Sequence, residues 1–329
     1  MTGQDGRHPT MNTRAPRATT VLLQRLAAAL KRHLPQAVSG DQRGVHQARV
    51  ASRRLREAVP VLATGLQGAK AGKARRKIRR LTRALGTVRE LDVTIGLLDE
   101  LARSPNVART AVEHVRAHVL SERAGRRKLM LERLEHVDTD KLARRLASVG
   151  AALEETTLEP WRKALASRLI ARSRRLTIAM DEAGHMYAPE RLHRVRIAAK
   201  KLRYGLELAA DSGLTGAAPH LRILKRVQDM LGKLHDLQIL QAHVAAVEAE
   251  PRAGGVAARE ALEDLARHIE DQCRHLHGRY VAAAAALRET ALAIRKVIAP
   301  QLARPVRRSR PMKMVLSRAA DPRAVASDR

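Results

Sequence analysis

Residues 45–62 read VHQARVASRRLREAVPVL, and residues 192–208 repeat the pattern as LHRVRIAAKKLRYGLEL. Both stretches contain His-x-x-Arg, then Val or Ile, then two basic residues, Leu and Arg, and the two histidines lie 147 residues apart. A second pair follows at nearly the same spacing, with LGTVRELD beginning at Leu85 and LGKLHDLQ at Leu231. Two motifs in one order at one spacing are hard to reach by chance. We therefore predict a tandem duplication in which each half is an antiparallel bundle of about four helices.

A helical wheel of about 100° per residue divides each repeated stretch into an apolar face and a basic face. The apolar faces, predicted to pack into the core, are formed by Ala48, Ala51, Leu55, Val59 and Leu62 and by Val195, Ala198, Leu202 and Leu206. The opposite faces form two basic stripes, made of His46, Arg49, Arg53 and Arg56 and of His193, Arg196, Lys200 and Arg203.

The basic stripes contain no acidic residue, which makes them locally unfavourable. Like charges at i, i+4 on a helix cost roughly 0.2–0.5 kcal/mol per pair, so an ordinary solvated face mixes its signs. Successive turns rise about 5.4 Å, so the stripe cations can follow consecutive phosphates along an extended chain. Arg binds phosphate oxygens bidentately, Lys supplies a point charge, and His titrates near neutrality. We interpret the stripes as an anion-binding surface, against the alternative of an Arg-rich face that is merely solvated.

Helix formers dominate the whole chain and strand signals are missing, so the predicted fold class is all-α. We predict a disordered leader over 1–18, a first half over 19–157, a second half over 158–299 and a disordered basic tail over 300–329. Helix breaks are expected at Gly86 and Gly232, and a turn with a helix cap is expected at residues 39–41.

Composition narrows the possible partners. The 329 residues carry a formal net charge of +30, and so large an excess favours a polyanionic partner. One Trp, three Tyr and no Phe leave almost no platform for stacking single-stranded bases. The single cysteine, Cys273, allows no intrachain disulfide and fits a reducing cytoplasm. The sequence has neither a secretory signal nor an apolar run long enough to span a membrane.

The repeated motifs together resemble the CHAD family, the conserved histidine α-helical domain, over about residues 15–298. The resemblance implies two four-helix bundles related by a pseudo-twofold axis, with a basic groove that binds inorganic polyphosphate. It implies binding roles for the eight stripe residues, and further for Arg76, Arg79, Arg80, Arg222, Lys225 and Arg226. No Glu-x-Glu-x-Lys motif of an attached triphosphate-tunnel domain occurs, so we expect a stand-alone member associated with polyphosphate granules.

Three alternatives remain beside this interpretation. Catalysis is not expected, because the stripes lack carboxylates and no Gly-rich phosphate loop occurs. A metal site is not expected either: His114 and His118 lie at i, i+4, and His268, His275 and His277 are near one another, but such groups arise by chance among 14 histidines. No cofactor is predicted. Non-specific binding of DNA or RNA is the strongest competitor, since phosphate contacts supply most non-specific affinity. Glu90 and Asp236, at matching motif positions, could orient an Arg or His from the neighbouring helix or form structural salt bridges, and the salt bridge is the preferred expectation.

Overall fold

The computed structural model describes residues 18–66, 69–135, 137–156, 159–250 and 255–303, and every regular element in these ranges is a helix. The all-α class is therefore confirmed. Five helices come from the first half of the chain: α1 (Ala18–Ser39), α2 (Gln42–Leu62), α3 (Ala69–Leu101), α4 (Arg109–Glu135) and α5 (Thr139–Glu155). The second half contributes α6 (Glu159–Ala183), α7 (Pro189–Asp211), α8 (Ala218–Glu248), α9 (Val256–Ala293), the π-helical segment Ile294–Ile298 and α10 (Ala299–Ala303). Nearly all of the predicted leader and most of the predicted tail lie outside the described residues.

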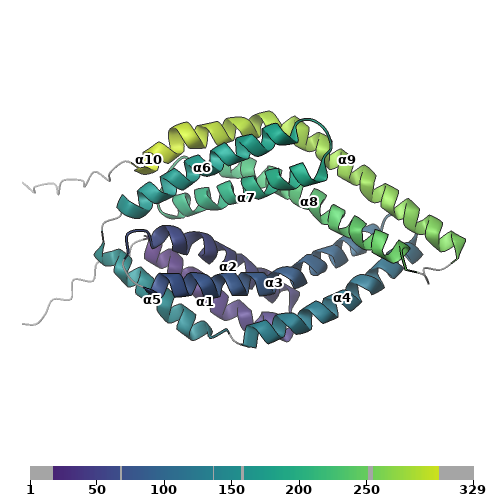
Figure 1. Ribbon diagram of the computed structural model, residues 1–329, viewed down its shortest axis with the longest axis horizontal. Helices are drawn as coiled ribbons and strands as arrows, with labels where there is room; N and C mark the ends of the chain where they lie inside the picture. The colour runs from purple at the N-terminus through teal and green to yellow at the C-terminus, as the bar shows by residue number, and fades with distance from the viewer. Residues whose placement is uncertain (1–17, 67–68, 136, 157–158, 251–254, 304–329) are drawn as a thin grey trace, which may run out of the picture.

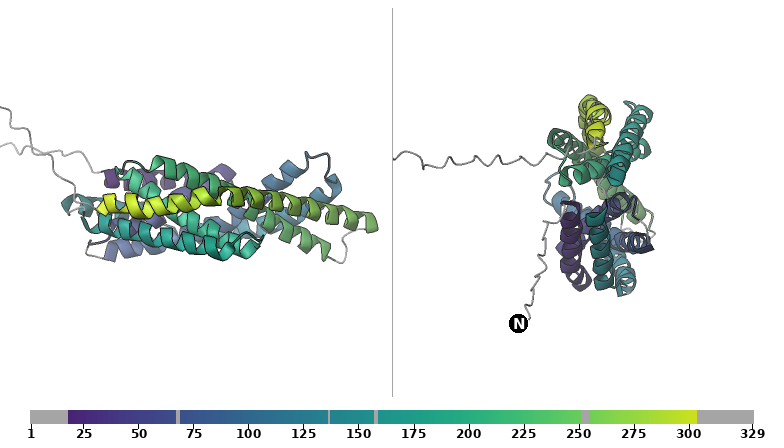
Figure 2. Two further views of the ribbon diagram at one scale, coloured as in Figure 1. Left: turned by 90° about the horizontal axis from the view of Figure 1, so that it is seen from above. Right: turned by 90° about the vertical axis from the view of Figure 1, so that its left-hand side faces the viewer.

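Helices neighbouring in sequence pack against one another within each half. In the first half α2 packs against α1 and α3, α3 against α4, and α5 against α1. In the second half α7 packs against α6 and α8, α8 against α9, and α10 against α6. The two halves lie one above the other in Figure 1, and Figure 2 shows that the molecule is elongated along both. The first half has five helices in the described residues, where the sequence predicted about four for each bundle. An origin by duplication stays a prediction.

The two halves touch each other at two junctions. One junction brings α1 and α2 against α6 and α7. At the other, α3 and α4 cross α8 and α9, at the right-hand end of Figure 1. The repeated motifs lie on α2, α3, α7 and α8, and ion pairs of Glu57 with Arg172 and of Arg54 with Glu207 join motif residues across the first junction.

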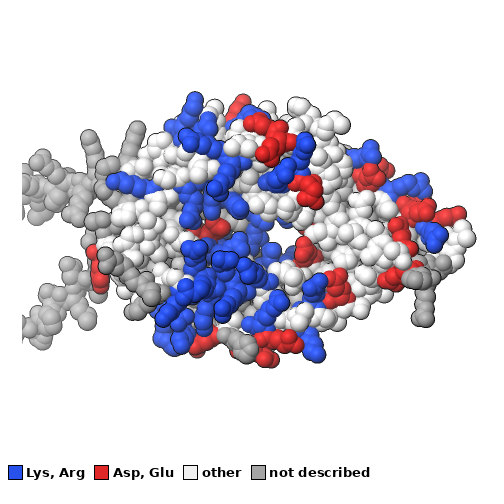
Figure 3. All heavy atoms as spheres, in the orientation of Figure 1, with Lys and Arg blue, Asp and Glu red and all other residues white. Residues whose placement is uncertain are grey.

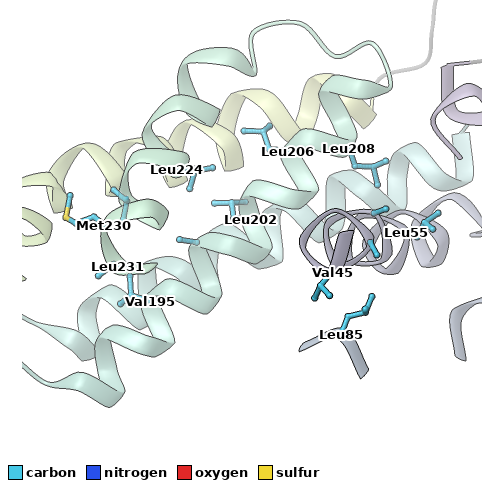
Figure 4. Close-up of a cluster of buried hydrophobic side chains, with 14 of the residues drawn as sticks. Val45, Leu55, Leu85, Val195, Leu202, Leu206, Leu208, Leu224, Met230 and Leu231 are labelled. Carbon is cyan, nitrogen blue, oxygen red and sulfur yellow. The ribbon is translucent and has the colours of Figure 1, made fainter. Parts of the chain in front are cut away.

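The predicted apolar faces do form the core. Leu55, Leu62, Leu202 and Leu206 are fully buried, and Figure 4 shows several of these leucines turned toward the neighbouring helices. Ala198 is the exception, since it is only partly buried while its neighbour Ala199 is fully buried. Burying a leucine side chain stabilises a fold by roughly 1.5–3 kcal/mol, so the apolar faces dictate which side of α2 and α7 points away from the core.

The turn before α2 fixes where that helix begins. Gly40 adopts φ of 99°, a left-handed conformation that favours glycine, and it ends α1. Asp41 then caps α2: its carboxylate accepts hydrogen bonds from the Arg43 backbone N–H at 3.1 Å and the Gly44 backbone N–H at 2.8 Å. This capped turn agrees with the sequence prediction for residues 39–41.

Two predicted helix breaks do not occur. Helix α3 continues through Gly86, and α8 continues through Gly232. A glycine costs a helix only about 1 kcal/mol relative to alanine, which packing along such long helices outweighs. Helical structure also continues through Pro300 to Ala303, beyond the residue at which the tail was predicted to start.

Candidate functional site

A cavity of about 560 Å³ lies between the two halves. We call it the central cavity. Figure 3 shows the surface hollowed there, with Lys and Arg side chains gathered around the opening. Helices α2, α3, α4, α7 and α8 contribute to it. Its charged and histidine lining residues are His46, Arg49, Arg53, Arg83, Arg89, Glu90, Arg133, Arg196, Lys200, His235 and Asp236.

The α2 stripe supplies His46, Arg49 and Arg53 to the central cavity. The Asp41 cap and the buried leucine face of α2 together orient these side chains toward α7. Arg49 Nε and Arg53 Nη2 are buried without a hydrogen-bond partner among the described residues. Burial, and then the charge of Arg53, lowers the pKa of Arg49 to about 10. An unpaired buried guanidinium N–H is unfavourable, and an anion in the cavity would satisfy it.

The α7 stripe supplies Arg196 and Lys200 from the opposite side. Arg196 Nε is also buried without a partner among the described residues. Burial first, and then the charges of Arg53, Arg196 and Arg49, lower the pKa of Lys200 to about 7. The two stripes therefore face each other closely enough for their charges to repel.

Three predicted stripe residues do not line the central cavity. Arg203 is held elsewhere: its Nε donates to Gln228 Oε1 at 2.7 Å, and its Nη1 pairs with Glu207. The side chain of His193 lies beside His235, with 3.2 Å between the two Nδ1 atoms, so one imidazole donates and the other accepts. Arg56 does not line the cavity, but its positive charge affects residues that do. That charge lowers the pKa of both Arg53 and Lys200.

The second repeated motif contributes lining residues that were not predicted as site residues. Arg89 of α3 and His235 of α8 occupy equivalent positions in the motif, and both line the central cavity. Burial first, and then the charge of Arg196, lower the pKa of His235 to about 4, so this imidazole is neutral near pH 7. The motif itself was the signal that could have identified them. Arg133 of α4 also lines the cavity, and no sequence pattern points to it.

Two carboxylates also line the central cavity. Asp236 Oδ1 lies 4.0 Å from Arg196 Nη2, which agrees with the salt bridge expected for this position. Burial raises the pKa of Asp236, against the opposing effect of Arg196. Glu90 lies across from it on α3, and its charge raises the pKa of Asp236 as well. The two basic stripes contain no carboxylate, as the sequence shows. The cavity that they line does contain carboxylates, which come from α3 and α8.

The six additional basic residues implied by the resemblance fall into two separate places. Arg76, Arg79 and Arg80 are exposed on the first half of α3. Arg222, Lys225 and Arg226 instead line a second groove, of about 460 Å³, together with Lys233 of α8 and Arg279 of α9. We call this second site the outer groove. None of these six residues lines the central cavity.

Comparison with known proteins identifies the family. The model of the CHAD domain matches residues 21–245, which is more than half of the chain, and the chain therefore belongs to the CHAD family. The crystal structure of the CHAD domain from the plant Ricinus communis is similar, with a TM-score of 0.52 and 22% identity, covering 84% of this chain and 91% of that chain. PptA from Streptomyces chartreusis has a TM-score of 0.55 and 16% identity, covering 82% of this chain and all of that chain. At these identities the structures support the fold alone. No curated protein matches the sequence.

None of the helices within the described ranges combines the length and hydrophobicity that a bilayer-spanning segment needs.

Proposed function

We propose that the protein binds inorganic polyphosphate in the central cavity, without catalysis. Membership of the CHAD family supports a role related to polyphosphate. The observation that carries the proposal is the set of buried, unpartnered guanidinium nitrogens on Arg49, Arg53 and Arg196. Leaving a buried donor unsatisfied costs about 1–3 kcal/mol, and more for a charged group. The three arginines that carry these donors line one cavity, and an anion bound there is the partner that we propose for them.

The excess of positive charge in the cavity supports a ligand with several negative charges. Six arginines, Lys200 and two carboxylates contribute formal charges around the space. A phosphate polymer supplies acceptor oxygens at short, regular intervals, and each oxygen can accept from a guanidinium or an ammonium group. A single small anion would satisfy only some of these groups.

The size of the central cavity favours a bare phosphate chain over duplex DNA. A sphere with the cavity's volume of 560 Å³ would be only about 10 Å across, whereas a DNA duplex is roughly 20 Å wide, as its groove dimensions imply. A duplex would have to remain outside the central cavity. Its phosphates could then contact only the exposed basic residues of α3 or those of the outer groove. Nucleic acid is therefore the competitor that a binding experiment must include.

Two further parts of the proposal are the absence of catalysis and the cellular location. Glu90 and Asp236 are the carboxylates closest to a bound chain, so hydrolysis by this protein would involve them first. Release of inorganic phosphate that Asp236→Asn abolishes would overturn the non-catalytic assignment. We also propose that the protein lies in the cytoplasm at polyphosphate granules. A fluorescent fusion that stays dispersed in cells containing granules would contradict that location.

The central experiment compares long-chain polyphosphate with duplex DNA of equal total charge over a salt series. We expect tighter binding of polyphosphate at every salt concentration, and we expect Arg49→Glu/Arg196→Glu to remove that preference. The matched control is Arg222→Glu/Arg226→Glu, which makes the same change of charge in the outer groove. For DNA, the logarithm of the affinity falls by about 0.9 per unit of log salt concentration for each phosphate that the protein neutralises.

The two double variants separate the possible results. If the central variant loses polyphosphate binding while the outer-groove variant retains it, the central cavity is the site. Equal losses in both variants would overturn the assignment to the central cavity: they would show a non-specific effect of net charge or binding in the outer groove, where the family resemblance also implies binding residues. Equal binding of DNA and polyphosphate that neither variant changes would overturn the proposal. Circular dichroism of both variants checks that the helices remain folded.

A further inference from the structure

A cluster of two histidines and a glutamate lies at one junction between the halves. His118 and Glu122 are one turn apart on α4, and His243 comes from α8. One potential ligand atom from each of the three lies within 4.8 Å of the other two. Each of the three side chains is partly buried, and none of them lines the central cavity. The cluster therefore joins two helices from different halves of the molecule by groups that bind metal ions.

Hydrogen bonds already orient two of the three groups. His118 Nδ1 lies 3.1 Å from Glu250 Oε1, and a carboxylate can only accept, so the imidazole donates from Nδ1. That tautomer leaves the lone pair on Nε2. Glu122 Oε1 accepts from Arg126 Nε at 3.2 Å, while its other oxygen, Oε2, faces His243 Nδ1 at 3.8 Å. Histidines that bind metals in proteins typically donate their second ring N–H to a carboxylate, as His118 does here.

We propose that His118, Glu122 and His243 bind one divalent transition-metal ion, with zinc as the ion that their donor set matches best. Two imidazoles and one carboxylate are a known set for zinc, with water in the fourth position. Zinc–ligand distances of about 2.0–2.2 Å place neighbouring ligands roughly 3.3 Å apart. The three groups must therefore approach one another, and rotation of partly exposed side chains is sufficient for that.

Local charge makes this junction suitable for a cation in an otherwise basic protein. Glu122 and Glu250 bring two negative charges to the cluster, against one positive charge on Arg126. This cluster differs from the pair of histidines, His114 and His118, that the sequence alone brings together. His114 and His118 share a helix face, but the residue that completes the site with His118 comes from α8, 125 positions later in the chain. A bound ion would cross-link the two halves.

The test is a zinc titration of the full chain, free of metal, of polyphosphate and of any histidine tag. Isothermal calorimetry gives the stoichiometry, and cobalt absorption in the visible range reports tetrahedral coordination. We expect one ion per chain, with at least tenfold weaker binding for His118→Ala and for His243→Ala. His114→Ala is the matched control, because this exposed histidine lies one turn away on the same helix. Glu250→Gln should weaken binding about tenfold, as is usual for the partners of ligating histidines.

A thermal scan adds a readout that does not depend on calorimetry. Zinc should raise the unfolding midpoint of the wild type and of His114→Ala, because binding to the folded state alone stabilises it. It should leave the midpoint of His118→Ala and His243→Ala unchanged. Absence of zinc binding by the wild type, or binding that neither histidine substitution weakens, would overturn the proposal. Because the central cavity uses other residues, polyphosphate binding by the same variants is expected to stay intact.

Discussion

Arg53 of α2 stacks its guanidinium over the ring of Tyr204 of α7, with 4.9 Å between the guanidinium carbon and the ring centroid. Arg203 approaches the same ring at 4.8 Å. One tyrosine thus holds two arginines, one from each half of the molecule. A cation over an aromatic face gains about 0.5–2 kcal/mol, which offsets part of the repulsion between the two guanidinium groups.

Replacing Tyr204 tests whether this stacking positions Arg53 for binding. We expect Tyr204→Ala to weaken polyphosphate binding roughly three- to tenfold, the equivalent of one lost cation–π contact. Tyr204→Phe keeps the ring and should bind like the wild type. Fluorescence anisotropy with labelled polyphosphate measures both. Equal losses in the two variants would assign the effect to the hydroxyl group instead of the ring.

Replacing Arg49 and Arg196, whose Nε atoms are buried without a hydrogen-bond partner among the described residues, should affect stability and binding in opposite directions. Arg49→Met/Arg196→Met keeps unbranched side chains of similar length but removes two buried charges. Each unsatisfied donor costs about 1–3 kcal/mol, and loss of the ion pair between Arg196 and Asp236 offsets part of the gain. We therefore expect the free energy of unfolding to rise by about 1–3 kcal/mol in total. Affinity for polyphosphate should fall at least tenfold, since each hydrogen bond to a charged group is worth about 1.5–3 kcal/mol.

Chemical denaturation and binding titrations measure the two effects of this double methionine variant. The control is Arg222→Met/Arg226→Met, two exposed sites where a surface change should alter stability by less than about 0.5 kcal/mol. A loss of both stability and affinity in the central variant would show that the arginines hold the fold together.

The pH dependence of binding should report Lys200. Its pKa in the free protein is about 7, and a bound polyanion favours the charged amine and raises that pKa. Affinity should therefore be highest below pH 7 and fall as the pH rises through 7, because binding then requires uptake of a proton. Titrations between about pH 6.5 and 9 measure this slope. Lys200→Arg should flatten it, because an arginine stays charged over this range; an unchanged slope would contradict the assignment.

The same lysine should make the free protein more stable in alkaline solution. The folded pKa of Lys200 lies below its ordinary value of 10.5, so the unfolded chain binds more protons between these two pH values. Stability contributed by this group therefore rises with pH over that window and is lowest at and below pH 7. Denaturation midpoints of the wild type and Lys200→Met, compared across this range, check the sign.

Neutralising the cavity carboxylate should strengthen binding. Asp236→Asn removes a negative charge beside the proposed path of the polymer, and we expect affinity to rise about three- to tenfold, as a few ångströms of separation at intermediate dielectric imply. Asp229→Asn is the control, because Asp229 lies in the outer groove and pairs with Lys225 at 3.0 Å. Weaker binding by Asp236→Asn would show that this carboxylate positions Arg196.

The sequence predicted the helical class and the orientation of α2 and α7 because both follow from local periodicity. A wheel places Leu55 opposite Arg53, and burial of the leucine then determines where the arginine points. Whether the two basic stripes face each other depends on how the two halves of the molecule pack together. No local pattern in a single sequence indicates that packing. The family resemblance supplied that expectation.

Other features were missed for specific physical reasons. Gly86 and Gly232 suggested helix ends, but one glycine costs a helix only about 1 kcal/mol relative to alanine, and packing along α3 and α8 outweighs that cost. Arg203 belongs to a basic stripe by position, yet Gln228 and Glu207 compete for its guanidinium. The proximity of His118 and His243 depends on the crossing of α4 and α8, which no spacing along one helix reveals.

The two junctions set the width of the central cavity independently of any ligand, and a site of fixed width treats every segment of a uniform polymer alike. A chain of N units offers about N − n + 1 equivalent positions to a site that covers n of them. The observed affinity per molecule therefore grows in proportion to polymer length without any new contact, by about 1.4 kcal/mol for each tenfold increase. A preference for long chains would then reflect the larger number of equivalent binding positions on each chain. Several copies of the protein would bind side by side along one polymer.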